Sequence, residues 1–228
     1  MILLSKTHVR PYKVISMSFP LRFLQLLKNL PLIDLGTGHQ RHHTKSKKII
    51  FRHAKKFAPT GKTALDMGCG DGFWSEKLIG LGYRVTSVDH AIHYPKAQAI
   101  DLEGDLPFPD ESFDLAWSTD VIEHLYRPER IIQEIKRVLK PGGLLLLTTN
   151  NSYFWIYPIF RIFGYTPRNM QNPDHKQFFH LRDIERLFPR AKIYGFFPYA
   201  ILKLTVASPW MINHLSPSFV IKITREDI

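Results

Sequence analysis

Residues 62–150 carry the clearest periodic pattern of the chain. Short, mainly apolar runs at 63–67, 83–88, 97–102, 113–118 and 144–149 predict strands, and the last is apolar enough to be buried on both faces. Between the runs, apolar residues recur every three or four positions over 73–81 and 128–139, which predicts amphipathic helices. Strands that alternate with helices in this order predict a doubly wound α/β domain with a mostly parallel sheet.

Two further helices are predicted nearer the N-terminus. Ser18 is placed to cap the first, which ends by Pro31. The second spans about 41–57, with an apolar stripe that includes Ile49, Ile50 and Ala54. Pro59 and Gly61 close this region. We therefore expect a helical N-terminal extension over 1–61 and one domain over 62–228.

Composition narrows the class of protein. The chain has 228 residues, 44% of them hydrophobic and 13% aromatic, which is typical of a globular protein and excludes disorder, collagen and coiled coil for the whole. No apolar run approaches the roughly 20 residues that cross a bilayer, so no transmembrane helix is expected. The N-terminus lacks a secretory apolar segment and Cys69 is the single cysteine, which together predict a reducing, cytoplasmic compartment.

The formal net charge of +11 lies almost entirely in the N-terminal extension. Residues 1–62 hold 13 of the 31 Lys and Arg residues and a single acid, Asp34, whereas the remainder is near neutral. Such a basic segment predicts an anionic partner, either RNA or a membrane surface. With a membrane surface as the partner, the protein would be membrane-peripheral. A basic helix that is merely solvated is the alternative.

A glycine-rich segment, Leu65 to Gly72, joins the first strand of the domain to a helix. Glycines at 68, 70 and 72 allow a tight turn and the close approach of a ligand. A dinucleotide fingerprint would need a third glycine where Phe73 stands, and Asp71 would repel a pyrophosphate at the helix start. The loop therefore favours a ligand with a cationic group.

Asp89 closes the second strand of the domain. An acidic side chain at this point can accept hydrogen bonds from both hydroxyls of an adenosine ribose. The alternative is an aspartate that only caps the following turn.

Four segments in sequence carry a family resemblance: LDMGCGDG, VTSVDH, the stretch from Asp101 to Leu125, and the stretch from Glu134 to Asn151. Together they resemble a class I S-adenosylmethionine-dependent methyltransferase of the small-molecule, type 11-like branch. The resemblance covers roughly residues 62–150. It implies a Rossmann-like sheet of seven strands, with 192–197 and 219–224 as the last two.

The same resemblance implies a set of residues for S-adenosylmethionine. The glycine loop would hold the methionine moiety, Asp89 the ribose, Asp101 and Leu102 the adenine edge, and Ser118 the backbone near the sulfonium. The complete cofactor set is Asp66, Gly68, Cys69, Gly70, Asp89, His90, Asp101, Leu102 and Ser118. Only 11 residues separate Asp89 from Asp101, which leaves little room for a helix, so His90, Ile92 or Tyr94 would shield the adenine.

His124 follows the fourth strand, near the edge where ligands bind in such folds, and is the first candidate for a general base or substrate contact. The alternative is a hydrogen-bonded histidine that never titrates. Tyr153, His175 and His180 are further substrate candidates in a substrate cap over 151–190. Its aromatic start predicts a lid, a membrane contact, or a core or homodimer contact. The histidines lack ligand spacing, so no metal is expected.

The sequence thus predicts methyl transfer from S-adenosylmethionine to a small-molecule or lipid-like acceptor. The alternative is an RNA or protein methyltransferase whose basic N-terminal helices bind the target. A third hypothesis is a methyltransferase-like fold without activity. The presence of the residues expected to bind the cofactor disfavours it, namely Asp66, Gly68, Gly70, Asp89 and Asp101. Ser118-Thr119-Asp120-Val121 stands where amino-group methyltransferases of nucleic-acid bases carry an N/D-P-P-Y tetrapeptide.

Overall fold

A computed structural model describes residues 22, 34, 42–198 and 204–228. Its centre is a sheet of eight strands in the order β3-β2-β1-β4-β5-β8-β6-β7. The strands are β1 (Thr63–Met67), β2 (Arg84–Asp89), β3 (Ala97–Ala99), β4 (Phe113–Thr119), β5 (Leu139–Asn150), β6 (Lys192–Phe196), β7 (Thr205–Val206) and β8 (Ser218–Thr224). The first five are parallel, and β8 runs antiparallel between β5 and β6.

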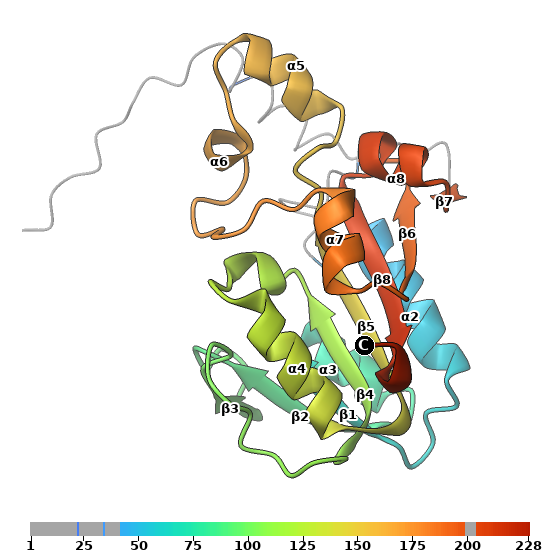
Figure 1. Cartoon of the computed structure of the whole chain (residues 1–228). Helices are drawn as coiled ribbons and strands as arrows, with labels where there is room; N and C mark the ends of the chain where they lie inside the picture. Colours follow the sequence, from blue (N-terminus) through green and yellow to red (C-terminus); the bar gives the residue numbers. More distant parts are fainter. Residues whose placement is uncertain (1–21, 23–33, 35–41, 199–203) are drawn as a thin grey trace, which may run out of the picture.

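Helices cover both faces of the sheet (Figure 1). They are α2 (Lys45–Lys56), α3 (Phe73–Ile79), α4 (Pro128–Val138), α5 (Ile156–Ile162), α6 (Pro167–Met170), α7 (Leu181–Leu187) and α8 (Pro209–Leu215), with 3₁₀ turns η2 (Ile122–His124) and η3 (Arg225–Asp227). α2 and α3 lie on one face, and α4 and α7 on the other. None of the helices in the described residues is long and apolar enough to span a membrane.

The core is divided by the sheet because successive side chains of a strand point to opposite faces. On one face, Leu65, Ala116 and Leu145 pack with Ile131 and Ile135 of α4. The other face joins buried residues of α2, α3, β1, β4, β5 and β8, namely Ile49, Ile50, Ala54, Trp74, Leu78, Ala64, Leu115, Trp117, Leu144, Leu146 and Val220. Both faces of β5 are buried, as its continuous apolar run predicts.

The doubly wound architecture expected from the sequence is confirmed, with three differences in detail. The expected seven strands are eight, because β7 pairs with β6 over only two residues and is too short to leave a pattern. β3 ends at Ala99 and not at 102. β5 begins directly after α4 and runs through Pro141 to Gly143, where Gly142 has a φ of +71° and the pairing with β4 shifts in register.

The N-terminal region contributes one helix to the described domain. α2 begins where the backbone N–H of Lys45 donates to a carboxylate oxygen of Asp34, and negative charge at a helix N-terminus is favourable. The expected helix over 18–30 lies outside the described residues, apart from Arg22. The division of the chain at residue 61 stays a prediction, although α2 packs on the sheet.

Candidate active site

The parallel strands β1, β2, β4 and β5 end at one edge of the sheet, and the segment with α5 and α6 lies above that edge (Figure 1). In doubly wound folds, ligands bind outside the carboxyl ends of the strands. The candidate site residues after β1, β2, β4 and β5 therefore lie at one end of the molecule.

The glycine loop after β1 adopts a conformation that requires glycine. Gly68, Gly70 and Gly72 have φ angles of +69°, +56° and +81°, which side chains with a Cβ rarely adopt. A Cβ at Gly68 would meet a methyl group of Val121 at 2.3 Å. The loop is therefore packed tightly against the turn after β4.

Two buried groups stabilise the start of this loop. Asp66 accepts a hydrogen bond from Ser75 of α3 at 2.6 Å, and Ser87 of β2 donates to Ser75 at 2.8 Å. Burial raises the pKa of Asp66 to about 7, and it raises the pKa of the Cys69 thiol to about 12. Cys69 is therefore a protonated packing residue, because a thiolate is the reactive form of cysteine.

Asp89 joins the glycine loop to β2. One carboxylate oxygen accepts the backbone N–H of Gly70 at 2.8 Å, and the other lies 2.8 Å from Nδ1 of the exposed His90. Asp89 thus faces the loop and is bound to it. Asp101 lies further along, is exposed and accepts the backbone N–H of Glu103 at 3.0 Å, while the neighbouring Leu102 is buried.

A buried ion pair lies at the end of β4. Lys47 of α2 contacts Asp120 at 2.9 Å, and Thr148 of β5 donates to the other Asp120 oxygen at 2.9 Å. Asp120 has a φ of +58°, a conformation that is strained for a residue with a side chain. Ser118, two residues before Asp120, is fully buried in the strand.

The turn η2 brings His124 against His175, which precedes α7 in the chain. The two rings make an edge contact with centroids 4.7 Å apart. Glu123 is buried beside them and accepts from Thr149 at 2.8 Å. Burial, followed by the charge of Asp120, raises the pKa of Glu123, while burial lowers the pKa of His124.

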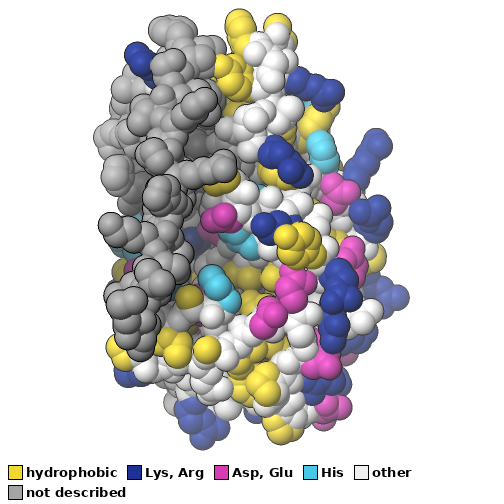
Figure 2. All heavy atoms as spheres, turned by 90° about the vertical axis from the view of Figure 1, so that its left-hand side faces the viewer, with side chains coloured by type: hydrophobic (Ala, Val, Ile, Leu, Met, Phe, Trp, Pro, Cys, Tyr) yellow, Lys and Arg dark blue, Asp and Glu magenta, His cyan; other side chains and the backbone are white. Residues whose placement is uncertain are grey.

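A second group of ring side chains lies after β5. The ring centroid of Tyr153 lies 4.9 Å from that of His180 and 5.6 Å from that of His214. With Trp210 these residues line a pocket of about 660 Å³ between the start of the cap, α7 and α8. Histidine and acidic side chains also gather near the middle of the face in Figure 2.

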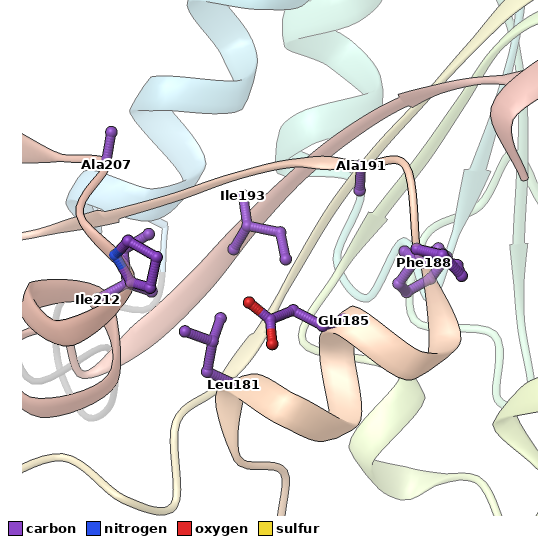
Figure 3. Close-up of a pocket in the computed structure, with 9 residues that line it drawn as sticks. Leu181, Glu185, Phe188, Ala191, Ile193, Ala207 and Ile212 are labelled. Atoms are coloured by element: carbon purple, nitrogen blue, oxygen red, sulfur yellow. The ribbon is translucent and has the colours of Figure 1, made fainter.

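A smaller pocket of about 340 Å³ lies between α7, β6 and α8. Figure 3 shows Glu185 of α7 beside Leu181 and Ile193 in this pocket. Neither this pocket nor the larger one is lined by a residue of the glycine loop, by His124 or by His175. Both pockets are therefore separate from the predicted cofactor site.

The structure brings the predicted site residues into three places. The first place is the glycine loop, with Asp66, Gly68, Cys69 and Gly70 in it and Asp89 and His90 beside it. In the second place His124 contacts His175, and in the third Tyr153 contacts His180. Sequence reasoning did not single out Lys47, Asp120 or Glu123. Glu123 could have been found as the residue next to His124, whereas no sequence signal links Lys47 to Asp120. The individual roles of the site residues stay predictions.

The strand order, the glycine loop and the acid at the end of β2 together define a class I S-adenosylmethionine-dependent methyltransferase domain. Residues 65–147 match the family described as "Methyltransferase domain". S-adenosylmethionine is the cofactor that this match and the named relatives imply. The residues fit such a ligand, because the Asp89 carboxylate lies beside the glycine loop at the end of β2, where it can accept hydrogen bonds from ribose hydroxyls.

Named relatives agree with this class. The chain is 30% identical over 135 residues to a probable S-adenosylmethionine-dependent methyltransferase of Mycobacterium tuberculosis, covering 54% of this chain and 47% of the relative. It is 36% identical over 109 residues to a ubiquinone biosynthesis O-methyltransferase of Glaesserella parasuis, covering 40% of this chain and 46% of the relative. The chain thus spans about half the length of these relatives.

A solved structure supports the fold. An S-adenosylmethionine-dependent methyltransferase of Thermotoga maritima superimposes with a TM-score of 0.57 at 18% identity, over 78% of this chain and 88% of the other. The expected Rossmann-like methyltransferase fold is thereby confirmed.

Proposed function

We propose that the protein transfers the methyl group of S-adenosylmethionine to an oxygen atom of a small, partly apolar acceptor. The observation that carries this proposal is the pocket of about 660 Å³ lined by Tyr153, His180, Trp210 and His214. Its volume and its mixture of aromatic and polar side chains suit a small organic molecule. The likeness to a ubiquinone biosynthesis O-methyltransferase supports an oxygen nucleophile.

The chemistry is an in-line displacement at the methyl carbon. A lone pair of the acceptor oxygen forms the new C–O bond while the C–S bond breaks, and its electron pair returns to sulfur, leaving S-adenosylhomocysteine. The acceptor loses its hydroxyl proton to a base or to water. Most of the acceleration comes from holding the oxygen and the methyl group in line, away from bulk water.

This chain's own residues would divide that work. The glycine loop and Asp89 would hold the cofactor, with Asp89 accepting from the ribose hydroxyls. His124 and His175 lie at the carboxyl edge, where the acceptor oxygen must approach. Tyr153 and His180 would contact the body of the acceptor from the cap.

RNA or protein as the acceptor is the competing proposal. It rests on the basic N-terminal segment, most of which lies outside the described residues. Within the described part, two of its lysines already serve the fold. Lys47 pairs with Asp120, and Lys45 donates to the carbonyl oxygen of Phe197 at 2.8 Å. This use of positive charge inside the domain favours the small-molecule proposal.

The decisive experiment uses S-adenosylmethionine with a labelled methyl group and separates the products by class. The full chain is incubated with a cell extract, which is then divided into organic-soluble molecules, protein and RNA. We expect the label in the organic-soluble fraction, and loss of that label with Asp89→Ala. Label that follows RNA or protein instead would overturn the small-molecule proposal in favour of its competitor.

A second arm tests the acceptor side. His124→Ala is expected to lower turnover by roughly 10²- to 10⁴-fold while the affinity for S-adenosylhomocysteine stays within about twofold, because His124 lies after β4 and apart from the glycine loop. Calorimetric titration measures the affinity. Equal losses in binding and turnover would assign His124 to the fold of the cofactor site.

A further inference from the structure

Three side chains with metal-binding atoms converge at the carboxyl edge of the sheet. Glu123 and His124 come from η2, and His175 comes from the segment before α7. Their candidate ligand atoms all lie within 4.8 Å of one another. Among the described residues, this is the one group of three or more histidine, cysteine or acidic side chains close enough to share an ion. The sequence spacing alone predicts no metal, because 51 positions of chain separate the two histidines.

The surroundings hold both histidine rings in a form that can bind a cation. Nδ1 of His175 lies 3.1 Å from the side-chain oxygen of Gln171, so Nδ1 carries the proton and the ring lone pair is on Nε2. The His124 ring hydrogen-bonds the backbone at Asp174. Metal-binding histidines in proteins have such an outer partner, which fixes the tautomer and the ring orientation.

The third group is a carboxylate held by donors. Thr149 donates to one Glu123 oxygen at 2.8 Å, and Asn150 approaches the other at 3.3 Å. A carboxylate has about four lone-pair sites, so these two bonds leave acceptor capacity on the side of the histidines. Glu123 is 1% exposed, and a buried carboxylate is costly unless it is paired or binds a cation.

We propose that Glu123, His124 and His175 bind a divalent transition-metal ion of the Zn²⁺ or Mn²⁺ type. Two imidazoles and one carboxylate are a ligand set that such ions accept, with further positions left for oxygen ligands. In tetrahedral coordination the ligand atoms lie about 3.3–3.4 Å apart, so atoms within 4.8 Å of one another need to close by up to about 1.5 Å when an ion binds.

The role of this ion rests on the proposed function. An acceptor hydroxyl bound to the ion loses its proton more easily, and that proton passes to water. The resulting oxygen anion is the nucleophile for the methyl carbon. The ion therefore favours acceptors with an oxygen that can coordinate it, such as a phenol or a hydroxyl beside a second oxygen. His124 would then be an ion ligand and not a general base.

Binding of the ion is tested without methyl transfer. The full chain is treated with a chelator, dialysed and titrated with Zn²⁺ by calorimetry, and with Co²⁺ while its visible absorption is recorded. We expect about one equivalent of ion per chain, and at least a tenfold loss of affinity in His124→Ala, His175→Ala and Glu123→Gln. His93→Ala, which removes an exposed histidine after β2, is the matched control and should bind like the unchanged chain.

A fold check accompanies each variant, because His175 and Glu123 are buried. Affinity for S-adenosylhomocysteine should stay within about twofold of the unchanged chain. Gln171→Leu is a milder variant that keeps all three ligands and should still weaken Zn²⁺ binding by roughly 10- to 100-fold.

The outcomes separate the ion from the methyl transfer. Absence of Zn²⁺ and Co²⁺ binding in a chain that binds S-adenosylhomocysteine would overturn the metal site and leave the proposed function intact. Ion binding in the three ligand variants that is as tight as in the unchanged chain would also overturn the metal site. Ion binding at this cluster without methyl transfer to any fraction would keep the site and reject the proposed function.

Discussion

The predicted cofactor side and the proposed acceptor side of this site are built in different ways. On the cofactor side, Asp66, Gly68 and Gly70 follow one another along a single strand and loop, and Asp89 lies at the end of the neighbouring strand. On the acceptor side, each contact joins distant parts of the chain, as His124 with His175 and Tyr153 with His214 do.

This difference separates what a methyltransferase domain shares from what distinguishes one such enzyme from another. The cofactor is common to the family, and its site follows from strand ends with a fixed geometry. The proposed acceptor side depends on loops and short helices of the predicted cap, whose relative positions are set by tertiary packing.

The largest effect is expected at the Lys47–Asp120 pair, which joins α2 to the end of β4. Lys47→Ala should lower the free energy of unfolding by about 3 kcal/mol, because it leaves a largely buried carboxylate without its cation. Urea denaturation measures this. Lys48→Ala, on the exposed side of the same helix, should cost less than about 0.5 kcal/mol.

Rescue sharpens the interpretation of that pair. The double variant Lys47→Met with Asp120→Asn should recover most of the lost stability, because no uncompensated charge remains. If Lys47→Ala and Lys48→Ala destabilise equally, the pair does not join the two sides.

A second prediction concerns the packing of the glycine loop against the turn after β4. Gly68→Ala should lower stability by about 2–3 kcal/mol, since the new Cβ meets Val121 and the φ angle is unfavourable. Gly142→Ala shares the positive φ but has open space around it, so it should cost only about 1 kcal/mol. Thermal unfolding compares them. Equal losses of stability in Gly68→Ala and Gly142→Ala would show that Val121 moves aside and that the glycine loop is not tightly packed against the turn after β4.

The third prediction separates the sides by ligand binding. Asp89→Ala should weaken binding of S-adenosylmethionine by about 1.5–3 kcal/mol, roughly 10- to 150-fold, because charge-assisted hydrogen bonds are lost. Asp105→Ala removes an exposed acid that pairs with Arg130 and serves as the control. NAD should not bind. If Asp89→Ala binds S-adenosylmethionine with unchanged affinity, the role of Asp89 is limited to its hydrogen bond with the backbone of Gly70.

The smallest effect is a pH dependence from Asp66. Its pKa is about 7 in the folded chain and 3.8 ordinarily, so between these values the unfolded chain binds fewer protons and stability falls as pH rises. Asp66→Asn should make the decline of unfolding free energy between pH 5 and 7 shallower, by about 1 kcal/mol per pH unit. Asp101→Asn, which is exposed, should leave the slope unchanged. A steeper decline in Asp66→Asn would contradict the burial argument.

Sequence reasoning succeeded where local geometry decides. The strands β1, β2 and β4, the loop after β1 and the position of Asp89 all follow from apolar runs and glycines within a short stretch. The two-residue β7 leaves no pattern. The meeting of His124 with His175, and of Lys47 with Asp120, depends on tertiary packing, because residues far apart in the chain carry no spacing rule.

The packing of α2 has a consequence for the order in which the domain assembles during synthesis. Ile49 and Ile50 of α2 share a core with Val220 of β8, so the helix made before all the strands is covered by the last one. A ribosome-bound chain that ends before β8 leaves the part of the α2 stripe that packs on β8 exposed to solvent or to a chaperone. Completion of this half of the core is therefore tied to the arrival of β8, and a nascent chain should become resistant to protease only after that strand has emerged.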